Sequence, residues 1–407
     1  MLASGVTVLT LPSRGAGLAS IVVISRHGGS AYDPPGREGL GVLAHRMILR
    51  GSALRSAAEV AAALDSLGAR SSVQNDMELG TVSLTAPSSS FVSSVDLLLE
   101  CLTSPGLDSL EVIRERSKML AELAAREDRL LTRAFDLFHE TYFAGHPYHA
   151  PSMGYPGSIG DLTSESVAEY DRTHLHPADL VVSASGDFDA ALLIDRLAAA
   201  FPETEEPPVR FRAPAPPAPP GEPVEEVQKR RSQQAWIVAG FPAPAPGSAD
   251  EAPFAVMRSV LSGSMGSRLF FELRSRRSLA YQVGGFYRAH LNGPYFAAFI
   301  ATKGTQYAEA RDALVGEVHG ILEAPPTETE LQDARQFVRG EYLLRLERNE
   351  ERAHFYGSSE ALGLGLEYGA EFLRRVAAVT NDDVVRVART YLTAPVVAAI
   401  VPEGGGS

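Results

Sequence analysis

The spacing of apolar residues divides the first part of the chain into strands and helices. Short β-branched runs at residues 6–10 and 21–25 predict a pair of strands. From residue 39 to residue 52, apolar positions recur at three- and four-residue spacing, which predicts a largely buried helix that ends at Gly51. An alanine-rich amphipathic segment at residues 56–67 predicts a second helix.

The pattern continues beyond this pair of helices. Residues 81–85 alternate as a half-buried strand, and residues 90–102 predict a helix that is stopped by Pro105. A long helical pattern then extends from residue 110 to about residue 143. We therefore expect helices and strands to be mixed along the chain, as in an α+β protein.

Residues 162–180 and 379–397 share one sequence pattern, which indicates an internal duplication. Each copy continues through a turn into a β-branched or apolar strand. The identities fall at a constant offset of 217 and pair Thr163, Val167, Arg172, Thr173 and Leu175 with Thr380, Val384, Arg389, Thr390 and Leu392.

A proline-rich stretch at residues 207–223 lies between the two copies. Such a density of proline supports neither a helix nor a central strand, so we expect an extended, semi-rigid linker. The predicted domains are residues 1–206 and 224–407. Each is expected to be an α+β sandwich with helices packed on a mainly antiparallel sheet.

Composition and charge narrow the possible functions. At 407 residues, with 45% hydrophobic and 21% charged residues, the chain is typical of a globular protein with two or more domains. Its net charge of -13 argues against nucleic acid as a partner. Cys101 is the only cysteine, which excludes an intrachain disulfide. We see no leader and no apolar stretch of about 18 residues, so we expect a cytoplasmic protein with no membrane association, with the periplasm left open.

The predicted helix at residues 39–52 carries the first candidate chemistry. Its sequence, with the ending Met-Ile-Leu-Arg-Gly-Ser, resembles the zinc-binding helix of the pitrilysin/insulinase-like metallopeptidases. In that family the helix contains His-x-x-Glu-His, whose histidines hold zinc and whose glutamate activates a water molecule. The alignment places Val42, His45 and Arg46 at these three positions.

These substitutions remove the zinc site that the resemblance would imply. Val42 has no lone pair, and Arg46 carries a permanent positive charge that repels a cation. A lone histidine on an apolar helix is usually a core residue, and we interpret His45 in that way. The resemblance also implies that Glu122, two helical turns after Glu115, is a third zinc ligand left without partners; an ordinary surface glutamate is the alternative.

Two histidine pairs lie next to prolines: His146 with His149, and His174 with His176. Their spacings do not place imidazoles on one helix face, so we interpret both pairs as loop residues.

The second half carries a further family signature, Gly-Ser-Arg-Leu-Phe-Phe-Glu-Leu-Arg-Ser-Arg-Arg-Ser-Leu-Ala-Tyr, at residues 266–281. It is similar to the family segment whose arginine and tyrosine reach the peptide bond at the zinc, and these correspond to Arg274 and Tyr281. A guanidinium and a phenol are suitable donors to the oxyanion that forms during peptide hydrolysis. A basic helix end followed by a strand aromatic is the alternative interpretation.

Three departures from the family pattern accompany this segment. Ser275 stands where an acidic residue is usual, and Ser278 stands where glycine is usual. Residues 71–75, Ser-Ser-Val-Gln-Asn, replace the Asn-Ala-x-Thr edge strand with which family enzymes bind the substrate backbone. Substrate binding by the first half is therefore in question.

Together, the resemblance implies the non-catalytic subunit of a two-chain peptidase. We expect no cofactor in this chain, zinc in a homologous partner subunit, and unfolded peptides as substrates. Arg274 and Tyr281 would act at the partner's site. A scaffold of the same fold without proteolytic activity is the alternative, and an independent peptidase with a metal site rebuilt on His45 and Glu122 is a third.

Overall fold

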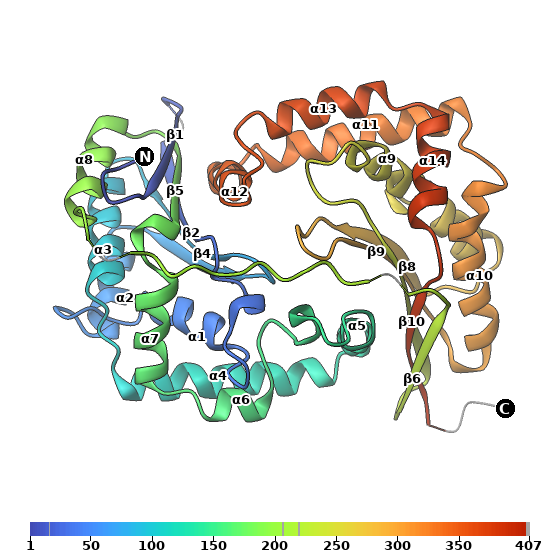
Figure 1. Ribbon diagram of the computed structural model, residues 1–407, viewed down its shortest axis with the longest axis horizontal. Helices are drawn as coiled ribbons and strands as arrows, with labels where there is room; N and C mark the ends of the chain where they lie inside the picture. The colour runs from blue at the N-terminus through green and yellow to red at the C-terminus, as the bar shows by residue number, and fades with distance from the viewer. Residues whose placement is uncertain (16, 206, 219, 404–407) are drawn as a thin grey trace. The chain divides into compact units, whose positions relative to one another are not determined.

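Two five-stranded sheets with the same strand order form the framework of the chain in a computed structural model, which describes residues 1–15, 17–205, 207–218 and 220–403 (Figure 1). In each sheet, the strand that comes first along the chain pairs in parallel with the strand that comes last along the chain. All other neighbouring strands pair antiparallel. The first sheet has the order β1 (Thr7–Pro12), β5 (Leu180–Gly186), β2 (Leu18–Ser25), β4 (Gly80–Pro87), β3 (Arg70–Asn75). The second has the order β6 (Val224–Arg230), β10 (Val396–Pro402), β7 (Gln234–Pro242), β9 (Tyr295–Lys303), β8 (Gln282–Arg288).

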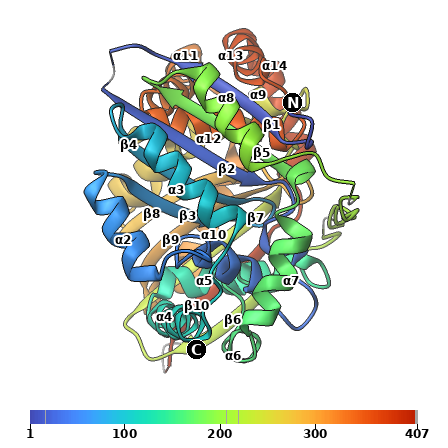
Figure 2. The same cartoon turned by 90° about the vertical axis from the view of Figure 1, so that its left-hand side faces the viewer.

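Helices α1 to α8 belong to the first half of the sequence. Their bounds are α1 (Leu40–Met47), α2 (Ala57–Ser66), α3 (Phe91–Thr103), α4 (Ser109–Glu127), α5 (Leu130–Tyr142), α6 (Pro156–Gly160), α7 (Ser164–His174) and α8 (Ala190–Ala200). One face of the first sheet packs on α2, α3 and α8, whose apolar residues share a buried core with the alternate residues Ile21 and Val23 of β2 (Figure 2).

Helices α9 to α14 follow in the second half. Their bounds are α9 (Glu251–Ser262), α10 (Tyr307–His319), α11 (Glu328–Arg345), α12 (Asn349–Ala361), α13 (Tyr368–Ala378) and α14 (Asn381–Tyr391). Apart from α12, these helices share one buried core with the second sheet. The prediction of an α+β fold with two similar domains is confirmed. No helix in the described part of the chain is both long and apolar enough to cross a membrane.

The duplicated sequence pattern corresponds to a duplicated structure. Helices α7 and α14 begin one residue after Thr163 and Thr380, which stand 217 positions apart. Each threonine hydroxyl accepts a hydrogen bond from the backbone N–H three residues later, at 3.3 Å from Ser166 and 3.2 Å from Asp383. This capping arrangement satisfies a free N–H group in the first helical turn and fixes where both helices start.

The structure divides into two compact units, and each unit contains one helix that comes from the other half of the sequence. One unit comprises residues 1–124, 150–213 and 345–366, and the other comprises residues 125–149, 214–344 and 367–407. Helix α5, from the first half, packs on β7 and β10 of the second sheet. Helix α12, from the second half, packs on β2 and β5 of the first sheet.

The long helical pattern predicted from residue 110 to about residue 143 corresponds to two helices, α4 and α5, with a short break between them. Helix α4 ends at Glu127, and α5 starts after Arg129, whose backbone is extended with φ -92° and ψ 97°. This break separates the segment that packs in the first unit from the segment that packs on the second sheet.

Both exchanged helices approach their sheets at a glycine. A Cβ atom added at Gly240 of β7 would lie only 2.0 Å from the Phe138 ring of α5. A Cβ atom added at Gly357 of α12 would lie 2.7 Å from Ile24 and 3.0 Å from Ser183. Because real Cβ contacts are longer than this, the two glycines allow the close packing of helix on sheet.

Candidate functional site

Helix α1, which aligns with the family's zinc helix, is fixed at its start by Asp33. The Asp33 carboxylate accepts hydrogen bonds from the backbone N–H groups of Gly39 at 2.7 Å and Gly41 at 2.8 Å. Burial raises the pKa of Asp33 to about 7, against the lowering effect of these donors. Val42, 7% exposed, faces the apolar cluster that α1 shares with α4, including Met119.

Arg46 and Glu122 form a bidentate ion pair between α1 and α4. The two guanidinium nitrogens lie 3.0 Å and 2.8 Å from the two carboxylate oxygens. Hydrogen bonding from Arg46 lowers the pKa of Glu122, so this carboxylate is ionised at neutral pH. The resemblance implies that Glu122 is a zinc ligand left without partner ligands. In the structure its partner is Arg46.

A second ionic group lies beside this pair. Glu115 is 2% exposed and contacts Arg50 at 2.8 Å and Lys118 at 2.7 Å. Two cations around one buried carboxylate offset its cost of desolvation. This part of α4 is therefore held by ion pairs.

His45 lies in the core of the first unit, with 2% of its surface exposed. Its Nδ1 donates a hydrogen bond to the Gly41 carbonyl oxygen at 2.8 Å. Burial lowers the pKa of His45 to about 4, so the ring is neutral at physiological pH. A Cβ atom at Gly80 would lie 2.2 Å from this ring, which shows how closely the histidine is packed.

These residues do not fit a zinc ion. Val42 offers no donor atom, Arg46 brings a cation to the ligand position, and Glu122 is already bound by that cation. Within the described ranges, no group of three histidine, cysteine, aspartate or glutamate side chains is arranged to hold a metal.

A pocket of about 490 Å³ lies beside the ion pairs. Its lining includes Arg46 and Glu122 together with Ser71, Ser72 and Val73 of β3. Strand β3 is an edge of the first sheet and pairs with β4 on one side. The degenerate metal helix and the altered edge strand thus lie at one pocket, as the resemblance implies for a substrate-binding region.

Arg274 lies in the π-helical turn η4 (Phe270–Arg276), and Tyr281 lies directly before β8. The Arg274 guanidinium carbon is 5.0 Å from the centroid of the Phe270 ring, a cation–π distance. Tyr281 donates its backbone N–H to the Ala301 carbonyl oxygen at 2.8 Å, while 48% of its surface remains exposed. The segment therefore fixes the backbone of Tyr281 and leaves its side chain accessible.

Between these two residues, Ser278 adopts a left-handed backbone conformation. Its φ of 52° is the only positive value among the described residues other than glycine. This conformation costs a residue with a Cβ atom about 1–2 kcal/mol, whereas glycine adopts it freely. The backbone conformation at this position favours glycine, the residue that is usual there in the family. Ser278 adopts the same conformation with backbone strain.

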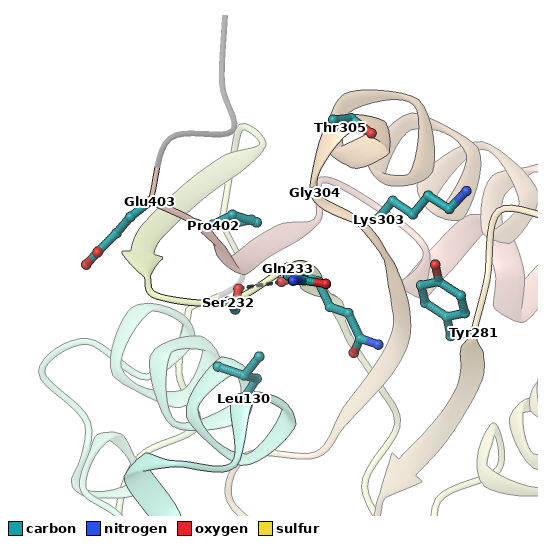
Figure 3. A pocket seen from close by; sticks show the side chains of 10 residues that line it. Leu130, Ser232, Gln233, Tyr281, Lys303, Gly304, Thr305, Pro402 and Glu403 are labelled. Atoms are coloured by element: carbon teal, nitrogen blue, oxygen red, sulfur yellow. Dashed lines mark hydrogen bonds between the residues drawn. The ribbon is translucent and has the colours of Figure 1, made fainter.

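Tyr281 lines a pocket of about 740 Å³ in the second unit (Figure 3). Lys303 at the end of β9 and Gln234 at the start of β7 also line this pocket, whereas Arg274 is absent from the lining. No motif in the sequence marks Lys303 as part of a site. The pairing of Gln282 with Ala301 in the hairpin of β8 and β9 is what brings it close to Tyr281.

The interpretation of the histidine pairs as loop residues is wrong for His174. This residue ends α7, is 4% exposed and stacks on Tyr170 with 3.9 Å between ring centroids. Its ring also lies 4.5 Å from that of Phe211 in the linker, and Phe211 stacks on His27 at 4.8 Å. His174 and His27 therefore belong, with Tyr170 and Phe211, to an aromatic cluster that holds the linker on the first unit.

The fold and the site together define a duplicated α+β chain with an arginine–glutamate ion pair between α1 and α4 in its first half and an accessible tyrosine in its second. The family model described as Insulinase (Peptidase family M16) matches residues 12–155. The model described as Peptidase M16 inactive domain matches residues 161–338. The chain belongs to this insulinase-like peptidase family.

Relatives and solved structures agree with this assignment. An uncharacterised zinc protease of Streptomyces coelicolor is 26% identical, with 90% of this chain and 81% of the relative covered. An uncharacterised zinc protease of Bacillus subtilis, YmxG, is 21% identical, with 93% and 91% covered.

Among solved structures, a peptidase M16 inactive domain from Pseudomonas fluorescens has a TM-score of 0.89 at 20% identity, with 100% of this chain and 98% of that chain covered. A protease from Helicobacter pylori has a TM-score of 0.90 at 17% identity, with 99% and 98% covered. At these identities the structures show a shared fold.

Proposed function

We propose that this chain is the non-catalytic subunit of a two-chain zinc peptidase. It binds a homologous subunit that carries the zinc site, and it supplies Arg274 and Tyr281 for the hydrolysis of unfolded peptides. The observation that carries the proposal is the contrast between the two halves. In the first, Arg46 is bound to Glu122 at the metal position; in the second, Tyr281 is 48% exposed at a pocket.

The proposed chemistry rests on charge development in the transition state. As water adds to the peptide carbonyl group, its oxygen becomes negative and is stabilised by fixed hydrogen-bond donors. The phenol of Tyr281 donates one O–H, and the guanidinium of Arg274 donates several N–H groups. Removal of one such donor typically lowers kcat about a hundredfold to a thousandfold.

The test is peptide hydrolysis by the co-purified complex of this chain with a zinc-motif homologue from the same cell. We expect activity and zinc in the complex, little activity in either chain alone, and at least a tenfold loss of kcat in Tyr281→Phe and in Arg274→Ala. Arg339→Ala, which removes an exposed arginine from α11, is the matched control and should retain activity.

A scaffold without a catalytic role is the second candidate, because loss of the metal site alone is equally consistent with it. Activity of the complex that is unchanged in both Tyr281→Phe and Arg274→Ala would refute the shared site and leave the scaffold. Stoichiometric zinc and hydrolysis by this chain alone would refute both.

A further inference from the structure

The lining of the pocket beside Tyr281 combines apolar surface with uncharged polar side chains, one lysine and one glutamate. Lys303 and Gln234 are direct partners across β7 and β9, so both side chains lie on the same face of the sheet. Together with the Tyr281 hydroxyl, they supply an ammonium, an amide and a phenol as possible donors. Figure 3 shows the Tyr281 hydroxyl and the Lys303 amine on the same side of the pocket.

Lys303 is unusual in a chain that relies on arginine for its positive charge. Its 37 basic residues include only three lysines, of which Lys118 is paired with Glu115 and Lys229 lies exposed on β6. In the described part of the chain, no carboxylate lies within ion-pair distance of the Lys303 amine. Its charge is therefore available to a ligand.

The carboxylate that lines the same pocket does not neutralise this charge. Glu403 lies across the pocket from Lys303, and its carboxylate is directed away from the lysine (Figure 3). The neighbouring arginines of the Arg/Tyr segment are mostly neutralised, as Arg276 pairs with Glu272 and Arg277 with Glu309. Arg274 is exposed and stacks on Phe270 but does not line the pocket, so Lys303 is the one positively charged residue among those that line it.

We infer that this pocket binds a carboxylate of the peptide substrate, with Lys303 as the residue that selects it and Gln234 as a second donor. The inference builds on the proposed function by naming the substrate class: peptides with an acidic side chain, or a free C-terminal carboxylate, near the bond held at Tyr281. The open pocket and its exposed lysine favour selection by charge. Lys303 is a specificity-determining residue and takes no part in bond cleavage.

The experiment measures peptide binding to this chain alone, so that it does not depend on a partner or on catalysis. Fluorescein-labelled, unstructured peptides that differ in one position, glutamate or glutamine, are titrated with the chain and followed by fluorescence anisotropy. We expect the glutamate peptide to bind about two- to fivefold more tightly, as for an exposed ion pair. Lys303→Ala should remove this preference, and Lys303→Glu should transfer it to a lysine peptide.

The two sources of the carboxylate are separated by a second peptide pair, which ends in a free acid or in an amide. A Lys303-dependent preference in the first pair identifies a side-chain carboxylate, and in the second pair a C-terminal one. Lys229→Ala removes the same charge elsewhere in the unit and should leave both preferences unchanged.

Either of two results would overturn the inference. One is the absence of peptide binding or of a charge preference in the natural chain, and the other is an equal effect of Lys303→Ala and Lys229→Ala. The proposed function fails by a different result, namely activity of the complex that is independent of Arg274 and Tyr281. A charge preference at Lys303 would be unaffected by that outcome.

Discussion

The double substitution Val42→His with Arg46→His should create a zinc site in this chain. The two positions stand four residues apart on the face of α1 that packs towards α4, and Glu122 on α4 already binds the side chain of residue 46. Two histidines at i and i+4 with one glutamate form a ligand set of the catalytic type, with a fourth position open. His45 is left in place because it packs in the core.

The cost of the double substitution without metal can be estimated from the structure. The Arg46–Glu122 pair has side chains 23% and 49% exposed, so its loss costs at most about 1 kcal/mol. A histidine at the buried position of Val42 adds about 1–3 kcal/mol if its ring nitrogens lack partners. Zinc at a hundred times its Kd should return about 2.7 kcal/mol, which leaves the variant near the stability of the natural chain.

Urea unfolding with and without zinc, together with metal analysis of the purified variant, tests this reasoning. We expect one zinc ion per chain and a zinc-dependent gain in the free energy of unfolding, neither of which the natural chain should show. Adding Glu122→Gln to the variant is the matched control and should weaken zinc binding. If the double variant binds no zinc, or binds it equally well after Glu122→Gln is added, then α1 and α4 do not retain the geometry of the family site.

Three further predictions concern the fold, the ionisation of a buried carboxyl group and the linker. Gly240→Ala should cost about 1–3 kcal/mol because its methyl group meets Phe138, and urea unfolding of the double variant with Phe138→Ala should show a total cost below the sum of the two. Burial raises the pKa of Asp171 to about 7, so its contribution to stability is present below about pH 4 and is lost as the pH rises through 7. In Asp171→Asn this loss should disappear, and the free energy of unfolding should fall less between pH 5 and pH 8, by an amount on the order of 1 kcal/mol; equal pH dependence would contradict the assignment. Phe211→Ala should lower stability by about 1 kcal/mol and speed tryptic cleavage at the flanking arginines, whereas Val209→Ala, at an exposed linker position, should do neither.

The parts of the fold that sequence analysis predicted are those set by local rules. Helix α2 begins where Ser56 and Glu59 cap each other, with the Ser56 backbone N–H 2.8 Å from the Glu59 carboxylate. The expected strand at residues 81–85 lies within β4, but the half-buried alternation expected there is wrong: residues 81–84 are all buried, because α12 covers the second face of the sheet. The duplication was visible because α7 and α14 are capped in the same way.

The features that sequence analysis missed depend on packing between distant segments. An amphipathic pattern shows which face of a helix is buried but does not name the sheet that buries it, so the docking of α5 on the second sheet was not predictable. The ring of Phe211 stands in a proline-rich stretch, where a single aromatic residue has no periodic pattern to mark its burial. Lys303 is part of the candidate site only because strand pairing places it beside Tyr281.

The ion pair of Arg46 with Glu122 explains how the contact between α1 and α4 can be stable without a metal ion. A zinc ion neutralises the carboxylate that binds it, and loss of the ion alone would leave that negative charge at the contact of α1 with α4. The Arg46 side chain both removes a ligand and supplies a positive charge with two hydrogen bonds to Glu122. Because Arg46 pairs with Glu122 in this way, the contact of α1 with α4 needs no metal ion to neutralise the carboxylate. Glu122, which the resemblance places at a zinc-ligand position, is here the acidic partner of an ion pair between two helices.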